Sequence, residues 1–268
     1  MASKDIILIT GANTGIGLEA VKAILRSELP YHVLLGSRTP AKADAAIAGL
    51  KKEIPETKSI VEALQVDITD DESIGKAVDV VQSKFGKLDV LVNNAGASFD
   101  GFFDRDIADA RNLFNKTYDV NVSGTQVMTA AFVPLLLKST SPRLIFLTSG
   151  LSTLEGASVT LMPKVTAKIE PGWPKTGLFA AAAYRSSKVA LNMVMVAWHS
   201  LLKPDGVRTW CISPGFLATG LGGNPEMLKK AGAGDPSLGG DLIKRVIEGE
   251  RDADVGKVVT QNGEVQPW

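Results

Sequence analysis

The chain has 268 residues, with 29 Lys and Arg against 29 Asp and Glu, so its net charge is zero at pH 7. This length suits one large α/β domain, and the balanced charge excludes a strong positive field for a nucleic-acid or anionic-membrane partner. Cys211 is the single cysteine, which rules out an intramolecular disulfide and fits a reducing compartment, so we predict a cytoplasmic protein. The first apolar run is too short for a signal-peptide core, and no stretch approaches the ~18 apolar residues of a membrane span. His32 and His199 lie far apart without ligand-spaced neighbours, so we expect no metal site.

Short apolar runs alternate with longer helical patterns along the chain. The runs predict strands at residues 5–10, 32–36, 60–66, 88–93, 142–149, 207–213 and 256–261. The intervening patterns predict helices at 15–27, 40–52, 71–85 and 181–202, and one or two more between 104 and 138. Strands that are apolar on both faces and separated by helices indicate a parallel sheet covered on both sides. With right-handed crossovers, this pattern predicts a doubly wound α/β fold in a single domain over residues 1–268.

Two segments depart from this alternation, an insert at 150–183 with several prolines and a glycine-rich stretch at 216–240. Both follow predicted strands, on the side where open α/β sheets bind their ligands. Long connections in a compact domain are usually functional. We expect the second segment to be a mobile loop next to a ligand.

The sequence TGANTGIG at 10–17 joins the first strand directly to the first helix. Gly11, Gly15 and Gly17 would let the backbone turn sharply, approach a pyrophosphate and pack the helix against the strand. The N–H groups and the dipole at the helix N-terminus favour phosphate there. An ordinary tight turn is the alternative, but the strand before it and the helix after it favour a dinucleotide site.

The second strand ends in GSRTP, where NAD-binding proteins usually carry an acidic residue for the ribose 2′-hydroxyl. Here Ser37 offers a hydroxyl, and Arg38 offers a planar guanidinium that can bind a phosphate. We therefore predict NADP(H) as the cofactor. A solvated loop arginine is the alternative.

Two further strand ends carry candidate cofactor residues. Asp67 follows the third strand, where it could accept a hydrogen bond from the adenine amino group or cap the next helix. Asn94, Ala95 and Gly96 end the fourth strand with small residues, which suit the close passage of a cofactor.

The motifs occur in one order along the chain: TGANTGIG, Asp67, NNAG at 93–96, Asn121, Ser149, Tyr184 with Lys188 four residues later, and SPG at 213–215. This series resembles the short-chain dehydrogenase/reductase family, whose pattern it matches from residue 5 to about 219. The resemblance implies the Rossmann form of the doubly wound fold. The long connection between Ser149 and Tyr184 is most similar to members of the carbonyl-reductase type.

The resemblance also implies a role for Tyr184 and Lys188, which their spacing alone places on one face of a helix. A carbonyl that accepts a hydride needs a proton on its oxygen, and Tyr184 would supply it, with its pKa lowered by the Lys188 ammonium. Ser149 would donate a hydrogen bond to the same oxygen, and Asn121 would hold a proton-relay water near Lys188. The family pattern assigns cofactor binding to Gly11, Asn13, Thr14, Gly15, Ile16, Gly17, Ser37, Arg38, Asp67, Ile68, Asn94, Ala95, Gly96, Tyr184, Lys188, Pro214, Gly215 and Thr219.

We therefore predict an NADPH-dependent oxidoreductase that passes a hydride to a ketone or aldehyde, reversibly. Many NADP-preferring relatives carry a basic residue before Gly15, where this chain has Thr14, so one of two phosphate contacts is missing. Two alternatives stay open: a non-redox isomerase, dehydratase or cyclase, and a non-catalytic NADP-binding protein. The intact set of Asn, Ser, Tyr and Lys argues against both.

Five aromatic residues in loops near the predicted site favour a bulky or aromatic carbonyl or alcohol substrate: Phe99, Phe102, Phe103, Trp173 and Phe216. We expect a monomer in which the insert 150–183 covers the helix face through which relatives dimerise. A dimer formed through the insert is the alternative.

Overall fold

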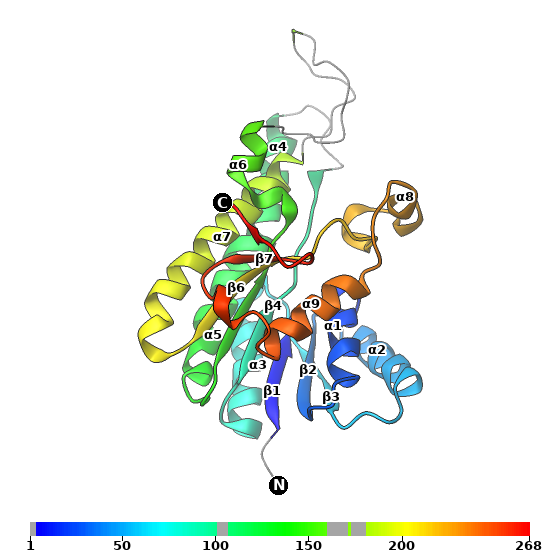
Figure 1. Cartoon of the computed structure of the whole chain (residues 1–268), viewed down its shortest axis with the longest axis vertical. Helices are drawn as coiled ribbons and strands as arrows, with labels where there is room; N and C mark the ends of the chain where they lie inside the picture. Colours follow the sequence, from blue (N-terminus) through cyan, green and yellow to red (C-terminus); the bar gives the residue numbers. More distant parts are fainter. Residues whose placement is uncertain (1–3, 101–106, 160–170, 173–180) are drawn as a thin grey trace.

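A central sheet with helices on both faces forms the molecule (Figure 1). The computed structural model describes residues 4–100, 107–159, 171–172 and 181–268. Within them the sheet has eight strands in the order β3-β2-β1-β4-β5-β6-β7-β8, parallel except for the antiparallel β7–β8 pair. The strands are β1 Asp5–Ile9, β2 Tyr31–Ser37, β3 Ile60–Gln65, β4 Val90–Asn93, β5 Arg143–Leu147, β6 Arg208–Ser213, β7 Val258–Thr260 and β8 Val265–Gln266. The predicted doubly wound, single-domain α/β fold is confirmed.

The helices form two layers, one on each face of the sheet. The α-helices are α1 Gly15–Leu25, α2 Pro40–Glu53, α3 Asp71–Phe85, α4 Ile107–Tyr118, α5 Thr125–Leu136, α6 Leu154–Val159, α7 Ala182–Leu202, α8 Pro225–Lys230 and α9 Ser237–Ile247. A π-helical turn, η2 (Asp119–Gly124), joins α4 to α5, and short 3-10 turns lie at η3 Gly150–Ser152, η4 Lys203–Asp205, η5 Gly220–Gly222 and η6 Asp252–Asp254.

Alternating residues of β1 enter two separate apolar cores. Ile7 and Ile9 pack with α1, α2 and α9, whereas Ile6 and Leu8 pack with α3, α5 and α7. Burial on both faces explains why the strands are continuously apolar. The strand order reverses between β1 and β4, and at such a switch point the loops that leave the strands diverge and form a ligand crevice.

The glycine-rich segment 216–240 contains helix α8 and the start of α9, neither of which the sequence analysis predicted. Gly240 shows why α9 was not predicted, because a Cβ atom placed on it would lie 2.4 Å from the Glu19 carbonyl carbon on α1. This glycine therefore allows two helices to pack closely, although in the sequence it is typical of a loop.

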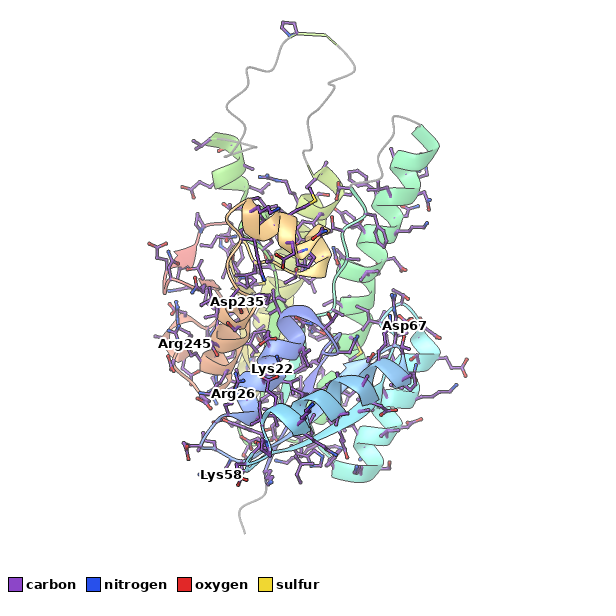
Figure 2. The ribbon with its side chains drawn as sticks, turned by 90° about the vertical axis from the view of Figure 1, so that its right-hand side faces the viewer. Lys22, Arg26, Lys58, Asp67, Asp235 and Arg245 are labelled. Atoms are coloured by element: carbon purple, nitrogen blue, oxygen red, sulfur yellow. The ribbon has the colours of Figure 1, made fainter. Side chains whose placement is uncertain are left out.

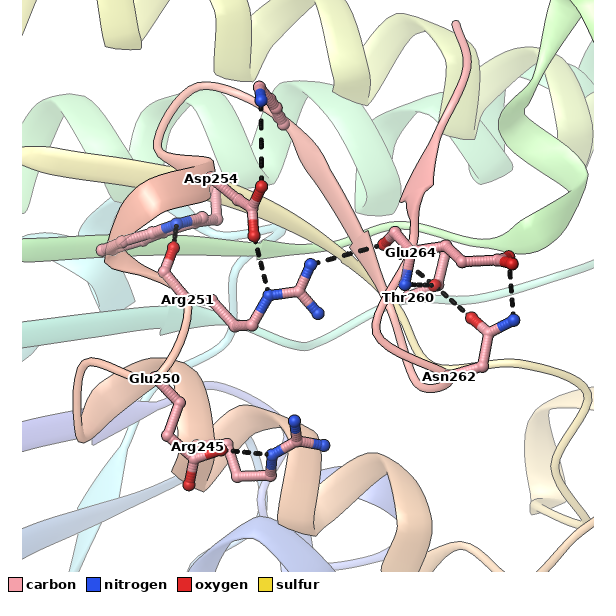
Figure 3. Close-up of polar contacts among 9 residues, drawn as sticks. Arg245, Glu250, Arg251, Asp254, Thr260, Asn262 and Glu264 are labelled. Atoms are coloured by element: carbon pink, nitrogen blue, oxygen red, sulfur yellow. Dashed lines mark hydrogen bonds and ion pairs between the residues drawn. The ribbon is translucent and has the colours of Figure 1, made fainter.

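The C-terminal strand pair is held by a chain of polar contacts (Figure 3). Arg251 Nε donates to Asp254 at 2.8 Å, and its guanidinium reaches the Glu264 carbonyl oxygen at 3.5 Å. Thr260 Oγ1 donates to the same carbonyl at 2.9 Å, and Asn262 Nδ2 donates to Glu264 Oε2 at 2.8 Å. These contacts fix the turn from which β8 returns toward the middle of the molecule.

No helix within the described ranges is both long and apolar enough to cross a membrane. In the same residues, no three or more His, Cys, Asp or Glu side chains gather as ligands for a metal ion.

Candidate active site

The glycine turn after β1 is bonded to the end of β4. Gly11 and Gly15 have φ angles of 62° and 58°, in the left-handed region that favours glycine. The Thr10 hydroxyl accepts hydrogen bonds from the backbone N–H groups of Asn94 and Ala95, each at 3.0 Å. The Asn94 side chain donates to the Thr10 carbonyl at 2.7 Å, so its amide holds this turn in place.

Close packing explains the third glycine of the turn. A Cβ atom on Gly17 would lie 2.5 Å from Asn94 Nδ2. Thr14 is the N-cap residue of α1, and its side chain makes no capping hydrogen bond, which leaves the first N–H groups of the helix to an external acceptor. Asn13, Thr14 and Ile16 are all at least partly accessible.

The two residues predicted to bind a 2′-phosphate differ in their surroundings. The Ser37 side chain is buried, and its hydroxyl bonds to the backbone of Thr39, where it shapes the turn. Arg38 is exposed and makes no ion pair within the described residues. By contrast, Lys22 on α1 and Arg26, the C-cap residue of that helix, both pair with Glu53. Figure 2 labels the two basic residues.

Asp67 lies beyond the end of β3, at the edge of the molecule (Figure 2). Its Oδ1 atom accepts from the backbone N–H and the hydroxyl of Thr69, at 3.0 and 2.8 Å. Asp70 caps α3 by accepting from the backbone of Glu72 and Ser73, so Asp67 is not the helix cap. The neighbouring Ile68 is buried.

Tyr184 and Lys188 lie one turn apart on α7, as predicted, with the Lys188 Nζ atom 5.8 Å from the centre of the Tyr184 ring. Lys188 is 3% exposed, and its ammonium donates to the Leu147 carbonyl oxygen at 2.8 Å. The Ser149 hydroxyl lies close enough to the Tyr184 phenol to lower the pKa of that phenol. Tyr184 and the buried Lys188 on α7 therefore meet Ser149, the N-cap residue of η3, beyond the carboxyl end of β5.

Asn121 in the π-helical turn is the fourth predicted catalytic residue, and it is fully buried. Its Oδ1 atom accepts from the Ala97 backbone N–H, and its Nδ2 atom donates to the Ala97 carbonyl, both at 2.8 Å. Nδ2 also donates to the Ser187 hydroxyl on α7 at 2.9 Å. A Cβ atom on Gly96 would lie 3.2 Å from Asn121 Oδ1 and 3.3 Å from Lys188 Nζ, so these groups surround the end of β4.

Burial governs the ionisation of this cluster. It lowers the pKa of Lys188 from 10.5 to about 8, opposed by a weaker influence from Cys211. Burial also raises the pKa of Tyr184, and the nearby Ser149 hydroxyl offsets this rise only in part. The predicted lowering of the Tyr184 pKa by Lys188 is therefore wrong for this structure. The ammonium hydrogen-bonds to the Leu147 carbonyl and lies over the ring, so it does little to offset the loss of solvation.

The segment after β6 lies next to the glycine turn. Pro214 is buried, Gly215 has a φ of 93°, and the Thr219 backbone N–H donates to the Leu217 carbonyl at 2.9 Å. A Cβ atom on Gly15 would lie 3.9 Å from the Thr219 side chain. Phe99 is partly exposed and Phe216 is 48% exposed. Phe102, Phe103, Trp173 and most of the insert 150–183 lie outside the described residues.

Behind Ser149 lies a buried polar network that was not predicted from the sequence. The Thr148 hydroxyl donates to Asn192 Oδ1 at 2.7 Å, and Asn192 Nδ2 donates to the Ser152 hydroxyl at 3.1 Å. Gln266 on β8 donates to the Ser149 carbonyl at 3.2 Å and to the Ser152 hydroxyl at 3.1 Å. Asn192 continues the four-residue spacing from Tyr184 through Lys188, which could have identified it. Gln266 has no such local signal.

Comparison with known proteins defines the class that this fold and site represent. The family model described as "short chain dehydrogenase" matches residues 5–161. Two curated relatives are the short-chain dehydrogenase/reductase tropE of Talaromyces stipitatus, 48% identical over 100% of this chain and 99% of the relative, and eupG of a Phoma species, 43% identical over 99% and 98%. The chain belongs to the short-chain dehydrogenase/reductase family and is a nicotinamide-dependent oxidoreductase of that family.

Solved structures agree on the fold. The NADPH-bound carbonyl reductase from chicken fatty liver has a TM-score of 0.79 at 22% identity, covering 99% of both chains. The carbonyl reductase Sniffer of D. melanogaster has a TM-score of 0.76 at 24% identity, covering 99% of this chain and 100% of its own.

Proposed function

We propose that this oxidoreductase reduces a ketone or aldehyde with NADPH, reversibly, with Tyr184 as the proton donor. The observation that carries the proposal is the placement of the Ser149 hydroxyl beside Tyr184, with Lys188 one turn along the same helix and its Nζ atom 5.8 Å from the ring. A tyrosine held in this way can protonate an oxygen on which negative charge develops. The Ser149 hydroxyl would donate to the same oxygen.

Lys188 and Asn121 would support this proton transfer. Lys188 would support it by holding the nicotinamide ribose beside Tyr184, because in this structure the ammonium does not lower the pKa of the phenol. The side-chain amide of Asn121 is engaged by Ala97 and Ser187. A proton-relay water would therefore be bound by the Asn121 backbone carbonyl, because a π-helical turn interrupts the regular hydrogen-bond ladder of a helix.

The residues at the switch point fit a nicotinamide dinucleotide. Left-handed glycines and uncapped N–H groups at the start of α1 suit the pyrophosphate, and Asp67 retains a second carboxylate oxygen for the adenine amino group. Bound NADPH would supply the hydride that reaches the carbonyl carbon. Tyr184 and Lys188 would hold the nicotinamide ribose, and Thr219, beside Gly15, would bind the carboxamide.

NADPH is the proposed form of the cofactor because Arg38 is exposed at the end of β2 without an ion pair in the described part of the chain. The chicken carbonyl reductase of similar fold is described as NADPH-bound, which supports the same choice. Phe99 and Phe216, both accessible, favour a bulky or aromatic carbonyl substrate. The single buried cysteine, Cys211, is consistent with a cytoplasmic location, which we also propose.

Oxidation of NADPH over a panel of aliphatic and aromatic ketones and aldehydes tests the proposal. We expect turnover with at least one aromatic carbonyl, and a lower kcat/KM with NADH. Binding of NADPH without consumption on any carbonyl, or its consumption without an alcohol product, would contradict a carbonyl reductase.

A further inference from the structure

The helix that carries Tyr184 begins without a side-chain cap of its own. Its N-cap residue is Ala181, which has no acceptor in its side chain and lies in the left-handed region at φ 48° and ψ 43°. Ala181 is the only non-glycine residue with a positive φ in the described ranges. Such a conformation persists only where the surroundings hold it. The first N–H groups of α7 therefore need acceptors from elsewhere in the chain.

Asp100 supplies those acceptors from a distant segment. Its Oδ1 atom accepts from the Ala183 backbone N–H and its Oδ2 atom from the Tyr184 backbone N–H, both at 2.9 Å. These are the second and third residues of α7, whose N–H groups a local Ser or Asp cap would bind. The Asp100 residue is 9% exposed, and its carboxylate lies at the positive end of the helix dipole.

The segment that delivers Asp100 also touches the rest of the site. Ala97 is paired through two hydrogen bonds with Asn121, and Gly96 lies against both Asn121 and Lys188. Residues 96–100 thus run from the end of β4, beside the proposed cofactor site, to the first turn of α7. A shift of α7 along its axis would break the bonds of Asp100.

We propose that Asp100 is a positioning residue, whose carboxylate caps α7 from the end of β4 and thereby fixes Tyr184 relative to Ser149 and the cofactor site. The inference rests on the proposed function, since it assigns Asp100 an effect on that reaction. The reason is geometric, because displacement of a reacting group by about 1 Å can lower a rate by ~10²-fold.

Asp100→Asn is the sharpest variant, because an amide keeps the side-chain shape but offers one acceptor oxygen where the carboxylate offers two. We expect kcat at saturating NADPH to fall about tenfold or more, with the NADPH dissociation constant changed less than about threefold. Asp70→Asn is the control, since Asp70 caps α3 through a single oxygen, Oδ1, which accepts from both Glu72 and Ser73, so that an amide can keep both bonds. Helix α3 also carries none of the four predicted catalytic residues. We expect the control to keep both its stability and its kcat, the latter within about twofold, because Asn and Asp are equally good N-cap residues. A kcat for Asp100→Asn within twofold of wild type, per folded molecule, would overturn the inference.

Hydrogen–deuterium exchange separates this inference from the proposed function. In the wild-type protein the amides of Ala183 and Tyr184 should exchange slowly, and Asp100→Asn should accelerate them at least about tenfold without altering the second half of α7. Equal exchange in both proteins would refute the cap even where the enzyme is active. If no carbonyl is reduced but these amides accelerate, the proposed function fails and the Asp100 cap stands, without its effect on turnover.

Discussion

Arg38 is the residue whose side chain separates the two forms of the cofactor in this account. Charge reversal in Arg38→Asp should weaken the binding of NADPH by on the order of 2–4 kcal/mol, because a charge-assisted contact with the 2′-phosphate is lost and repulsion is added. NADH, which lacks the phosphate, should be affected far less. The ratio of kcat/KM for the two cofactors measures this change. Lys51→Asp, at the other end of α2, is the control, because it alters net charge equally in the last turn of that helix. A parallel loss for both cofactors in Arg38→Asp would mean that Arg38 supports the loop.

Lys188 links the chemistry of the site to the stability of the fold. Its pKa is lowered from 10.5 to about 8 by burial, so between these values the unfolded chain holds a proton that the native state lacks. The free energy of unfolding therefore rises with pH across this window. Below the native pKa both states carry the proton, and burial of the charged lysine then lowers the free energy of unfolding by its full amount. Replacing Lys188 by Met removes that dependence.

We predict that the unfolding free energy of Lys188→Met, relative to wild type, is higher at pH 7 than at pH 10.5 by on the order of 2–3 kcal/mol. Turnover should be lost at every pH. Urea unfolding at both pH values measures the difference. Wild-type and variant stabilities that change in parallel with pH would show that the lysine is not desolvated as the structure indicates.

At the scale of elements, the π-helical turn η2 holds Asn121 against the sheet, and Gly124 permits this packing. A Cβ atom on Gly124 would lie 2.2 Å from the Ile68 carbonyl oxygen, a contact that backbone groups cannot relieve locally. Gly124→Ala should destabilise the protein by on the order of 1–3 kcal/mol and lower kcat, because η2 must move and carries Asn121 with it.

Gly75 provides the matched control on another helix. A Cβ atom on Gly75 of α3 meets nothing within 4 Å, so Gly75→Ala should stabilise the protein by about 0.5–1 kcal/mol through helix propensity alone. Urea unfolding compares the two variants. Equal effects of both substitutions would refute the packing argument for Gly124.

At the scale of the whole molecule, apolar side chains on α6 and α7 bear on assembly. Leu154 and Val159 are 62% and 84% exposed, and Met193 and Leu201 on α7 are 67% and 66% exposed. The described part of the insert 150–183 therefore does not cover Met193 or Leu201. That the insert takes the place of a partner on α7 and keeps the protein monomeric stays a prediction from the sequence. Light scattering coupled to size exclusion should then give a mass near the 28.3 kDa of one chain. A mass of twice or four times this value that persists on dilution would support assembly through the insert instead.

The parts of the molecule that could be predicted from sequence are those with a local signal. Continuous apolar runs predicted seven parallel strands, and short spacings predicted the glycine turn and the Tyr184–Lys188 face of α7. Helix α9 was missed because Gly239 and Gly240 resemble a loop until α1 is present to pack against them. Asp100 and Gln266 contact residues 83 and 117 positions away in the sequence. The spacing of apolar residues along the chain does not predict such long-range contacts. The ionisation of Tyr184 was predicted wrongly because burial depends on the whole fold.

The substitution Tyr184→Phe tests the central claim most directly, since it removes one hydroxyl and leaves the apolar packing of the ring in place. NADPH binding, followed by fluorescence titration, should be retained within about threefold, whereas turnover of a carbonyl that the wild type reduces should fall by at least ~99%, because a positioned acid contributes ~10²–10⁴-fold. Ser186→Ala, on the same helix outside the predicted catalytic set, should keep near-normal turnover. Near-normal turnover in Tyr184→Phe would contradict the account.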